Sequence, residues 1–316
     1  MDWKFNNDQF LLHKIIELKS LKKTELASKF DDLIRIIFHY KLSSEQKYDL
    51  INYFNKNLKL IYKTTNLKKI KILVLSNHYF EFFKNEIFLN GFYRDLFIEL
   101  DFAEIDNFDI GGFHKKKKKS KDYYDFILFS HFPNYYYDFK AKDKNIYNHI
   151  IKRIKSFCDI KIILTNIPSL NSNLFNQNLI NELNREIHKI SKNYDCHLWK
   201  IDKLANRYGE DFIHDKEYYF DNKIFFNPQN SDYISDNLCS VLSQLSYTSP
   251  RAIVTDLDNT FWKGILGDDG IDKINFSTGS SLTEPHYIYQ NFLKNLFNKG
   301  IIINISSKND YDYVKK

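Results

Sequence analysis

Two aspartates that directly follow an apolar run are the residues of this sequence best placed for chemistry. The run from Arg251 to Thr255 is typical of a strand and leads straight into Asp256 and Asp258. In open α/β sheets, ligands bind beyond the carboxyl ends of the strands. Two carboxylates that close repel each other, so a cation must neutralise them or one must keep its proton. If the triplet Asp256-Leu257-Asp258 is considered without its context, the alternative interpretation is an Asp-rich turn without a catalytic role.

The chemistry that suits this pair is phosphoryl transfer. Mg²⁺ is the natural hard cation for an all-oxygen site, and we expect Asp256 and Asp258 to hold it. Asp256 would attack phosphorus as the nucleophile while the metal offsets the charge of the reacting groups. Asp258 would protonate the leaving oxygen and then activate water against the aspartyl-phosphate.

The wider context of the triplet resembles a known superfamily. An Asp-x-Asp-x-Thr segment directly after an apolar strand, with a second strand ending in Ser further along, is similar to motifs one and two of the haloacid-dehalogenase (HAD) superfamily. The second strand is predicted over Ile301 to Ile305. The resemblance implies that Thr260, Ser307 and Lys308 bind the substrate phosphate.

A closer resemblance covers most of the chain. Residues 256–270 resemble the Asp-Leu-Asp-Asn-Thr-Leu-Trp-Gly-Gly…Gly-Glu-Asp-Gly signature of FkbH-like proteins, and Ser307-Lys308-Asn309 matches that family's Ser-Lys-Asn. Those proteins join a degenerate SGNH-hydrolase-like domain to a HAD domain. The resemblance implies a Mg²⁺-dependent phosphatase or phosphotransferase. It would process a glyceryl or acyl phosphate, a phosphorylated small molecule, for transfer to an acyl carrier protein.

The sequence also departs from the HAD pattern. The third-motif Lys and the fourth-motif acidic residue lie downstream of the second motif, and this sequence stops at Lys316. We therefore expect a truncated HAD domain that is weakly active or inactive, with Asp268, Asp269 and Asp310 as acidic candidates to substitute. A non-catalytic protein that binds a carrier or an acyl group, and an inert fragment of a disrupted gene, are the alternatives. The reading frame after Lys316 would separate them.

The elements that must position these residues fall into three expected regions. Residues 1–66 show helical spacing, and Ser43 with Gln46 resembles a capping box. Residues 67–248 alternate apolar runs (70–76, 126–130, 160–165) with helical stretches (145–157, 174–194, 232–245). This alternation predicts a parallel sheet with helices on both faces, an SGNH-like, flavodoxin-like α/β domain. Residues 249–316 follow a linker at 247–250. They predict a strand, a helix over 285–298 ended by Gly300, and a strand, the first part of a HAD Rossmann-like domain.

Ser76 is a second and weaker catalytic candidate. It follows the first predicted strand, where active SGNH enzymes carry their nucleophile, but Val74 and Leu75 precede it instead of Gly-Asp. The base histidine expected near the end of that domain is missing, because residues 225–228 contain none. A nucleophilic serine needs an adjacent base, so we expect Ser76 to bond the backbone and to have no histidine partner.

Composition excludes several classes of function. The net charge of +6 comes from 46 Lys plus Arg against 40 Asp plus Glu, and the run from Lys115 to Lys119, with Lys121, accounts for it. One such run favours a solvated loop over a nucleic-acid surface. The 3 cysteines show no metal or disulfide pattern, and we expect neither a signal peptide nor a membrane-spanning run. We expect a cytoplasmic protein.

Overall fold

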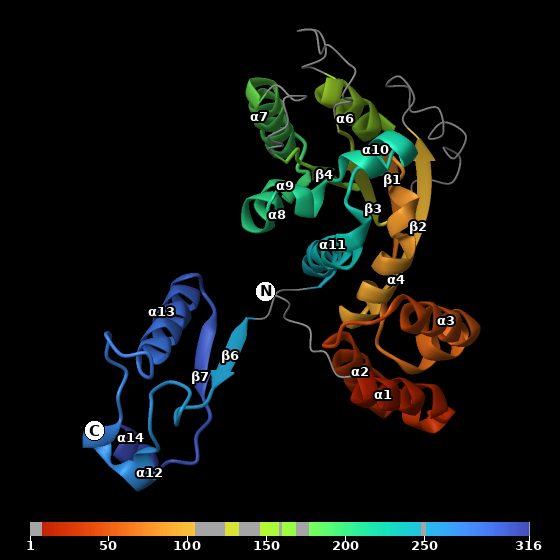
Figure 1. Ribbon diagram of the computed structural model, residues 1–316. Coiled ribbons are helices and arrows are strands. Elements are labelled where there is room, and N and C mark those ends of the chain that lie inside the picture. Colours follow the sequence, from red (N-terminus) through yellow and green to blue (C-terminus); the bar gives the residue numbers. More distant parts are fainter. Residues whose placement is uncertain are drawn as a thin grey trace. The chain divides into compact units, whose positions relative to one another are not determined.

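The computed structural model describes residues 8–104, 124–132, 146–157, 160–168, 177–247 and 251–315. The chain divides into two compact units, Met1–Ser246 and Tyr247–Lys316, and the second is drawn in blue in Figure 1. The lysine run at 115–121, Cys158 and residues 248–250 of the expected linker lie outside the described residues.

A five-stranded parallel sheet forms the centre of the first unit. Its order is β2-β1-β3-β4-β5, the flavodoxin-like order, and the predicted α/β class is confirmed. The three apolar runs become β1 (Lys68–Ser76), β3 (Phe126–Ser130) and β4 (Lys161–Thr165), joined by β2 (Leu96–Glu104) and β5 (His197–Trp199). Burial on both faces explains why the first three runs are apolar throughout. Strand β2 was not expected, because Glu99 and Asp101 interrupt its apolar pattern.

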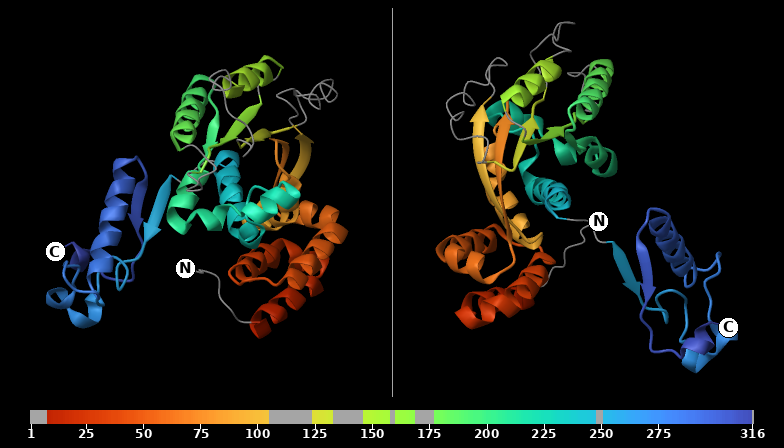
Figure 2. Two further views of the ribbon diagram at one scale, coloured as in Figure 1. Left: turned by 45° about the horizontal axis from the view of Figure 1, so that its top comes forward. Right: turned by 180° about the vertical axis from the view of Figure 1, so that it is seen from behind.

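Helices cover both faces of this sheet (Figure 2). The chain moves from β1 to β2 in one direction across the sheet and from β3 through β4 to β5 in the other. Because the crossovers are right-handed, the connecting helices lie on opposite faces. Helix α4 (Lys84–Tyr93) lies on one face, and α6 (Ile146–Phe157) and α7 (Gln177–Asn193) lie on the other. A helix that follows β5, α11 (Ser231–Ser246), packs on α4. The remaining short elements are η1 (Phe80–Phe83), α8 (Ile201–Tyr208), α9 (Glu210–Ile213), α10 (Lys216–Asn222) and η4 (Pro228–Asn230).

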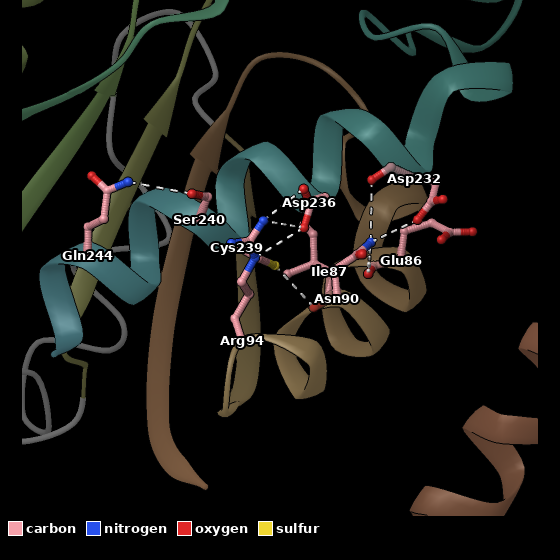
Figure 3. Close-up of polar contacts among 9 residues, drawn as sticks. All are labelled: Glu86, Ile87, Asn90, Arg94, Asp232, Asp236, Cys239, Ser240 and Gln244. Atoms are coloured by element: carbon pink, nitrogen blue, oxygen red, sulfur yellow. Dashed lines mark hydrogen bonds and ion pairs between the residues drawn. The ribbon is translucent and has the colours of Figure 1, made fainter. Parts of the chain in front are cut away.

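Polar contacts fix the last helix of this unit against α4 (Figure 3). The Arg94 guanidinium donates to the Asp236 carboxylate, with nitrogen–oxygen distances of 2.8, 3.0 and 3.2 Å. The Asn90 amide donates to Asp232 Oδ1 at 3.2 Å. The thiol of buried Cys239 donates to the Ile87 carbonyl of α4 at 3.5 Å. These contacts hold together two helices that are far apart in the sequence.

Three helices precede the sheet: α1 (Asp8–Ser20), α2 (Lys23–Phe38) and α3 (Ser44–Thr64). The predicted capping box is present, because the Gln46 backbone N–H donates to Ser43 Oγ and the Ser43 N–H donates to Gln46 Oε1. The apolar faces of these helices build a second core, which also takes in Phe92 of α4 and Phe97 of β2. The helical segment therefore packs on the α/β part of the same unit.

The second unit is a strand–helix–strand arrangement. Strands β6 (Ala252–Thr255) and β7 (Ile302–Ile305) are parallel neighbours, with α13 (Glu284–Asn298) between them in sequence. Gly300 ends the helix with φ of +85°, a conformation that favours glycine. The short elements α12 (Leu266–Asp269), η5 (Ile271–Lys273) and α14 (Tyr311–Val314) complete it. Its buried core consists of Leu257, Trp262 and Leu266.

The composition also predicted no membrane-spanning run and no disulfide framework. Among the described helices, none has both the length and the apolar character needed to cross a membrane. The described cysteines, Cys196 and Cys239, are buried and form no disulfide.

Candidate active site

Asp256 and Ser307 follow neighbouring parallel strands at the same edge of the second unit's sheet. Thr255, the last residue of β6, is in register with Ile305, the last residue of β7. The Ser306 backbone N–H donates to the Thr255 carbonyl at 2.9 Å, which extends the pairing past the strand ends. This is the placement that the strand–helix–strand pattern predicts.

Asp258 is held by three hydrogen-bond donors. Its Oδ1 accepts from Trp262 Nε1 at 3.1 Å and from the Leu266 backbone N–H at 3.0 Å. Its Oδ2 accepts from Asn309 Nδ2 at 2.9 Å, so the second motif supplies one of the three. Desolvation would raise the pKa of Asp258, but these donors favour the charged form and together hold the pKa below its ordinary value. The structure thus presents Asp258 as an oriented carboxylate.

The loop after Asp258 has a backbone that explains its sequence. Asn259 has φ of +53° and Gly264 φ of +110°, and Asn is one of the few residues that tolerate the left-handed region. The Asn259 N–H donates to the Gly264 carbonyl at 3.1 Å, and the Gly264 N–H donates to Asn259 Oδ1 at 3.1 Å. A side chain at Gly264 would be strained and would meet Asp269 Oδ2 at 3.3 Å. The closed loop thereby brings the indole of Trp262 within hydrogen-bonding distance of the Asp258 carboxylate.

Side chains of helix α13 contact the first motif, and the sequence did not reveal these contacts. His286 Nδ1 lies 2.9 Å from the Thr260 carbonyl oxygen, and Gln290 Nε2 donates to the Phe261 carbonyl at 2.7 Å. The Tyr289 hydroxyl lies 3.0 Å from Thr255 Oγ1. Residues three and four apart share one helix face, so polar side chains at this spacing were the signal that could have identified the contact.

Of the predicted phosphate ligands, Ser307 and Lys308 follow β7, and Thr260 lies in the loop that follows β6. Ser307 Oγ accepts from the Asn309 backbone N–H at 3.2 Å, which orders the second motif. Lys308 is exposed, and its ammonium has no ion-pair partner within the part of the chain that the structure describes. Thr260 is also exposed, with its carbonyl bound by His286. Thr260 and Lys308 therefore have side chains free to meet a phosphate.

The oxygen donors of the site fit a hard divalent cation. Asp256 is exposed, and only its Oδ1 is engaged, by the Leu257 N–H at 2.8 Å. Within residues 251–315 and the other described ranges, no three His, Cys, Asp or Glu side chains are grouped for a metal. The side chains of Asp269 and Asp310 are bonded locally, to the backbone N–H groups of Ile265 at 2.8 Å and Asp312 at 3.0 Å. Asp256 Oδ2 thus accepts no hydrogen bond from the described residues and is an oxygen of the kind that Mg²⁺ prefers, and Asp268 is likewise exposed.

Ser76 in the first unit has backbone rather than imidazole contacts. Its hydroxyl donates to the His78 carbonyl, and the His78 N–H returns a bond to Ser76 Oγ at 3.2 Å. The His78 ring turns to another serine, with Nε2 3.0 Å from Ser130 Oγ. His131 and His214 bond Tyr147 and the Phe225 carbonyl, respectively. Among the described residues no histidine ring meets the Ser76 hydroxyl.

The same histidines are buried and uncharged. Desolvation lowers the pKa of His78 to about 3 and of His131 to about 4. Ser130, the partner of His78, is fully buried, so a substrate cannot reach it in this structure. Four phenylalanine rings surround His78, with centroids 5.2 to 5.9 Å away. The geometry is that of a packed core.

Comparisons with known proteins identify a shared fold. No protein-family model and no curated protein matches the sequence. Among solved structures, the N-terminal part of the protein BF1531 from Bacteroides fragilis matches with a TM-score of 0.59 and 21% identity, covering 79% of this chain and 71% of that one. That protein contains a phosphatase domain and was crystallised as a complex with Mg.

Smaller hydrolases match more distantly. A lipase/acylhydrolase from Enterococcus faecalis has a TM-score of 0.43 at 13% identity, covering 57% of this chain and all of its own, 100%. A member of the lipolytic G-D-S-L family from Veillonella parvula has a TM-score of 0.39 at 10% identity, with coverages of 56% and 100%. Both of these TM-scores lie below 0.5. It is with the BF1531 fragment, a protein that contains a phosphatase domain, that the chain shares its α/β fold.

Proposed function

We propose that the second unit is the phosphoryl-transfer core of a Mg²⁺-dependent phosphatase or phosphotransferase of the HAD superfamily. The observation that carries this proposal is the hydrogen bond from Asn309 to Asp258, which joins two motifs at the ends of neighbouring parallel strands. The fold shared with the phosphatase-containing BF1531 fragment supports it. The signature over 256–270 and 307–309 favours the FkbH-like type.

The proposed reaction uses the two aspartates in turn. Asp256 Oδ2 attacks phosphorus, its bond to phosphorus forms, and the bond from phosphorus to the leaving oxygen breaks. The leaving oxygen takes a proton from Asp258, and Asp258, now ionised, takes a proton from the water that cleaves the aspartyl-phosphate. Bound Mg²⁺ would offset the negative charge of the carboxylates and the phosphoryl group. Thr260, Ser307 and Lys308 would bind the phosphoryl oxygens.

The hydrogen bonds on Asp258 bear on its two roles. Three donors favour its carboxylate, which suits the step that activates water. Proton donation to the leaving oxygen requires the protonated form of Asp258, which the negative charge of a bound phosphate would favour.

The proposed substrate is a small glyceryl or acyl phosphate, and the proposed acceptor is an acyl carrier protein. Within the described residues the site supplies two carboxylates and no third acid grouped with them. Mg²⁺ prefers near-octahedral oxygen coordination, so two carboxylates should hold it weakly. Weak or undetectable turnover is therefore expected for residues 1–316.

The test measures phosphate release from glyceryl phosphate, acetyl phosphate and p-nitrophenyl phosphate, with and without Mg²⁺. In parallel, ¹⁹F NMR detects Mg²⁺-dependent binding of beryllium trifluoride, which mimics a phosphoryl group on a carboxylate. Both signals should vanish in Asp256→Asn and persist in the matched control Asp272→Asn, an exposed aspartate of the same unit. Absence of Mg²⁺-dependent beryllium trifluoride binding to residues 1–316, even at high Mg²⁺ concentration, would replace this proposal with the non-catalytic alternatives.

A further inference from the structure

A cavity of about 350 Å³ lies in the first unit, between the helical segment and the edge of the sheet. Residues of helices α3 and α4 form its walls and residues of strands β1 and β2 its floor; Figure 1 shows where these four elements lie. Its volume falls at the lower end of the range for small-molecule pockets, about 300–1,000 Å³. The lining residues of β2 end at Asp101, which is in register with Leu73 of β1, so Ser76 at the carboxyl end of β1 is not part of the cavity.

One part of the cavity wall is apolar. Ile51 and Leu58 of α3 and Phe88 of α4 are only partly buried, although they face a core. Phe97 of β2 completes this wall, with its ring centroid 6.1 Å from that of Phe88. Partly exposed aliphatic and aromatic side chains that converge on a hollow can gain free energy by covering an apolar ligand.

The charges on the floor are already neutralised by protein groups. Glu99 pairs with Lys69 at 2.7 Å. Asp101 pairs with Lys71 at 3.4 Å and accepts from the Tyr124 hydroxyl at 2.7 Å. A cationic ligand would therefore have to displace an existing partner before it gained an ion pair.

The mouth of the cavity, in contrast, carries polar groups without protein partners. Lys84 and Asn85 open α4, and Asn55 lies opposite on α3. Across the described ranges none of these three side chains has a hydrogen bond or ion pair. Together they offer one positive charge and two amide groups next to the apolar wall.

We propose that this cavity binds a small monoanion with an apolar body, of which a medium-chain carboxylate is the simplest example. The carboxylate meets the Lys84 ammonium and the amides of Asn55 and Asn85. The hydrocarbon chain lies against Ile51, Leu58 and Phe88. The chemistry requires both parts, because neither an exposed ion pair nor a shallow apolar contact alone gives much affinity.

The experiment titrates octanoate into residues 1–316 by isothermal titration calorimetry, without Mg²⁺. One saturable site is expected. Acetate should bind at least about tenfold more weakly, because each buried methylene contributes about 0.8 kcal/mol. 1-Octanol, which lacks the anion, should bind at least about threefold more weakly than octanoate. Lys84→Gln should weaken the binding of octanoate by about the same factor, as expected for an exposed ion pair.

Two variants locate the site. Asn55→Trp should fill the mouth and abolish the saturable heat, while Lys56→Gln, an exposed lysine one position further along α3, should leave it unchanged. Both positions are exposed, and circular dichroism melts check that the variants fold. No saturable binding, or binding that survives Asn55→Trp, would overturn the proposal. Asp256→Asn should bind octanoate normally, so this result stands apart from the proposed phosphatase activity.

Discussion

The side-chain amide of Asn309 donates to Asp258 Oδ2 across 2.9 Å, although 51 positions separate the two residues. Asn309 lies just beyond β7 and Asp258 just beyond β6, so the bond exists only because these strands are parallel neighbours. With Trp262 and Leu266 on the other oxygen, it fixes the rotamer of the proposed acid–base residue. A catalytic carboxylate gains from such preorganisation, since no rearrangement is needed at the moment of reaction.

Asn309→Ala should raise the pKa of Asp258, because it removes one of the donors that favour the carboxylate. It should also destabilise the second unit by about 1 kcal/mol, the usual worth of one hydrogen bond. Carboxyl ¹³C NMR titration of labelled aspartate measures the pKa, and urea unfolding measures the stability. Asn304→Ala, at an exposed position of β7, is the matched control. An unchanged pKa in Asn309→Ala would show that the contact is absent in solution.

Ser76→Ala should leave any hydrolysis of p-nitrophenyl acetate unchanged, because the Ser76 hydroxyl contacts a backbone carbonyl and not an imidazole. The substitution should instead lower the stability of the first unit by about 1 kcal/mol, since it removes a buried hydrogen bond. Ser28→Ala, at an exposed serine of α2, should affect neither quantity. Loss of esterase activity in Ser76→Ala alone would establish this residue as a nucleophile.

The first unit should lose stability as the pH falls below about 6.5. Burial lowers the pKa of His131 to about 4, whereas the unfolded chain takes up the proton near its ordinary value of about 6.5. The unfolded state therefore binds more protons in this window, and the cost grows until the pH reaches about 4. For His131 alone it amounts to about 3 kcal/mol at most, at roughly 1.4 kcal/mol for each pH unit.

Urea unfolding at pH 7.5, 6 and 5 measures this loss. His131→Gln should reduce the dependence on pH, because the amide can keep a polar contact with Tyr147 but cannot take up a proton. His188→Gln, at an exposed position of α7, should leave the dependence as it is. Equal pH profiles for the three proteins would contradict the burial of a neutral His131.

Arg94→Met should destabilise the first unit by about 1.5 kcal/mol, because it removes a bidentate contact with the partly buried carboxylate of Asp236. The exposed pair of Lys29 with Glu25 provides the comparison. Lys29→Met should cost less than about 0.5 kcal/mol, since water screens an exposed pair. A double-mutant cycle with Asp236→Asn isolates the coupling. A coupling near zero would mean that the contact between Arg94 and Asp236 does not help to hold α4 and α11 together.

Local sequence determined most of the elements of the fold. The apolar run at 126–130 is β3 with the same bounds, and the helix expected over 285–298 is observed as Glu284–Asn298. The capping box at Ser43 was readable because its bonds join residues three apart. Strand β2 was missed because Glu99 and Asp101 break its apolar pattern, and those charges are tolerated through pairing with lysines of β1.

The sequence by itself also determined where the proposed chemistry lies, since an Asp-x-Asp segment after an apolar strand is a local pattern. Tertiary structure alone decided what surrounds it. Asn309 reaches Asp258 through strand register, and His286 and Gln290 reach the first motif through the packing of α13. It likewise decided that the His78 ring bonds Ser130 instead of Ser76. Local patterns follow from bonding between near neighbours, whereas these contacts join residues 26 to 52 positions apart and depend on how whole elements pack.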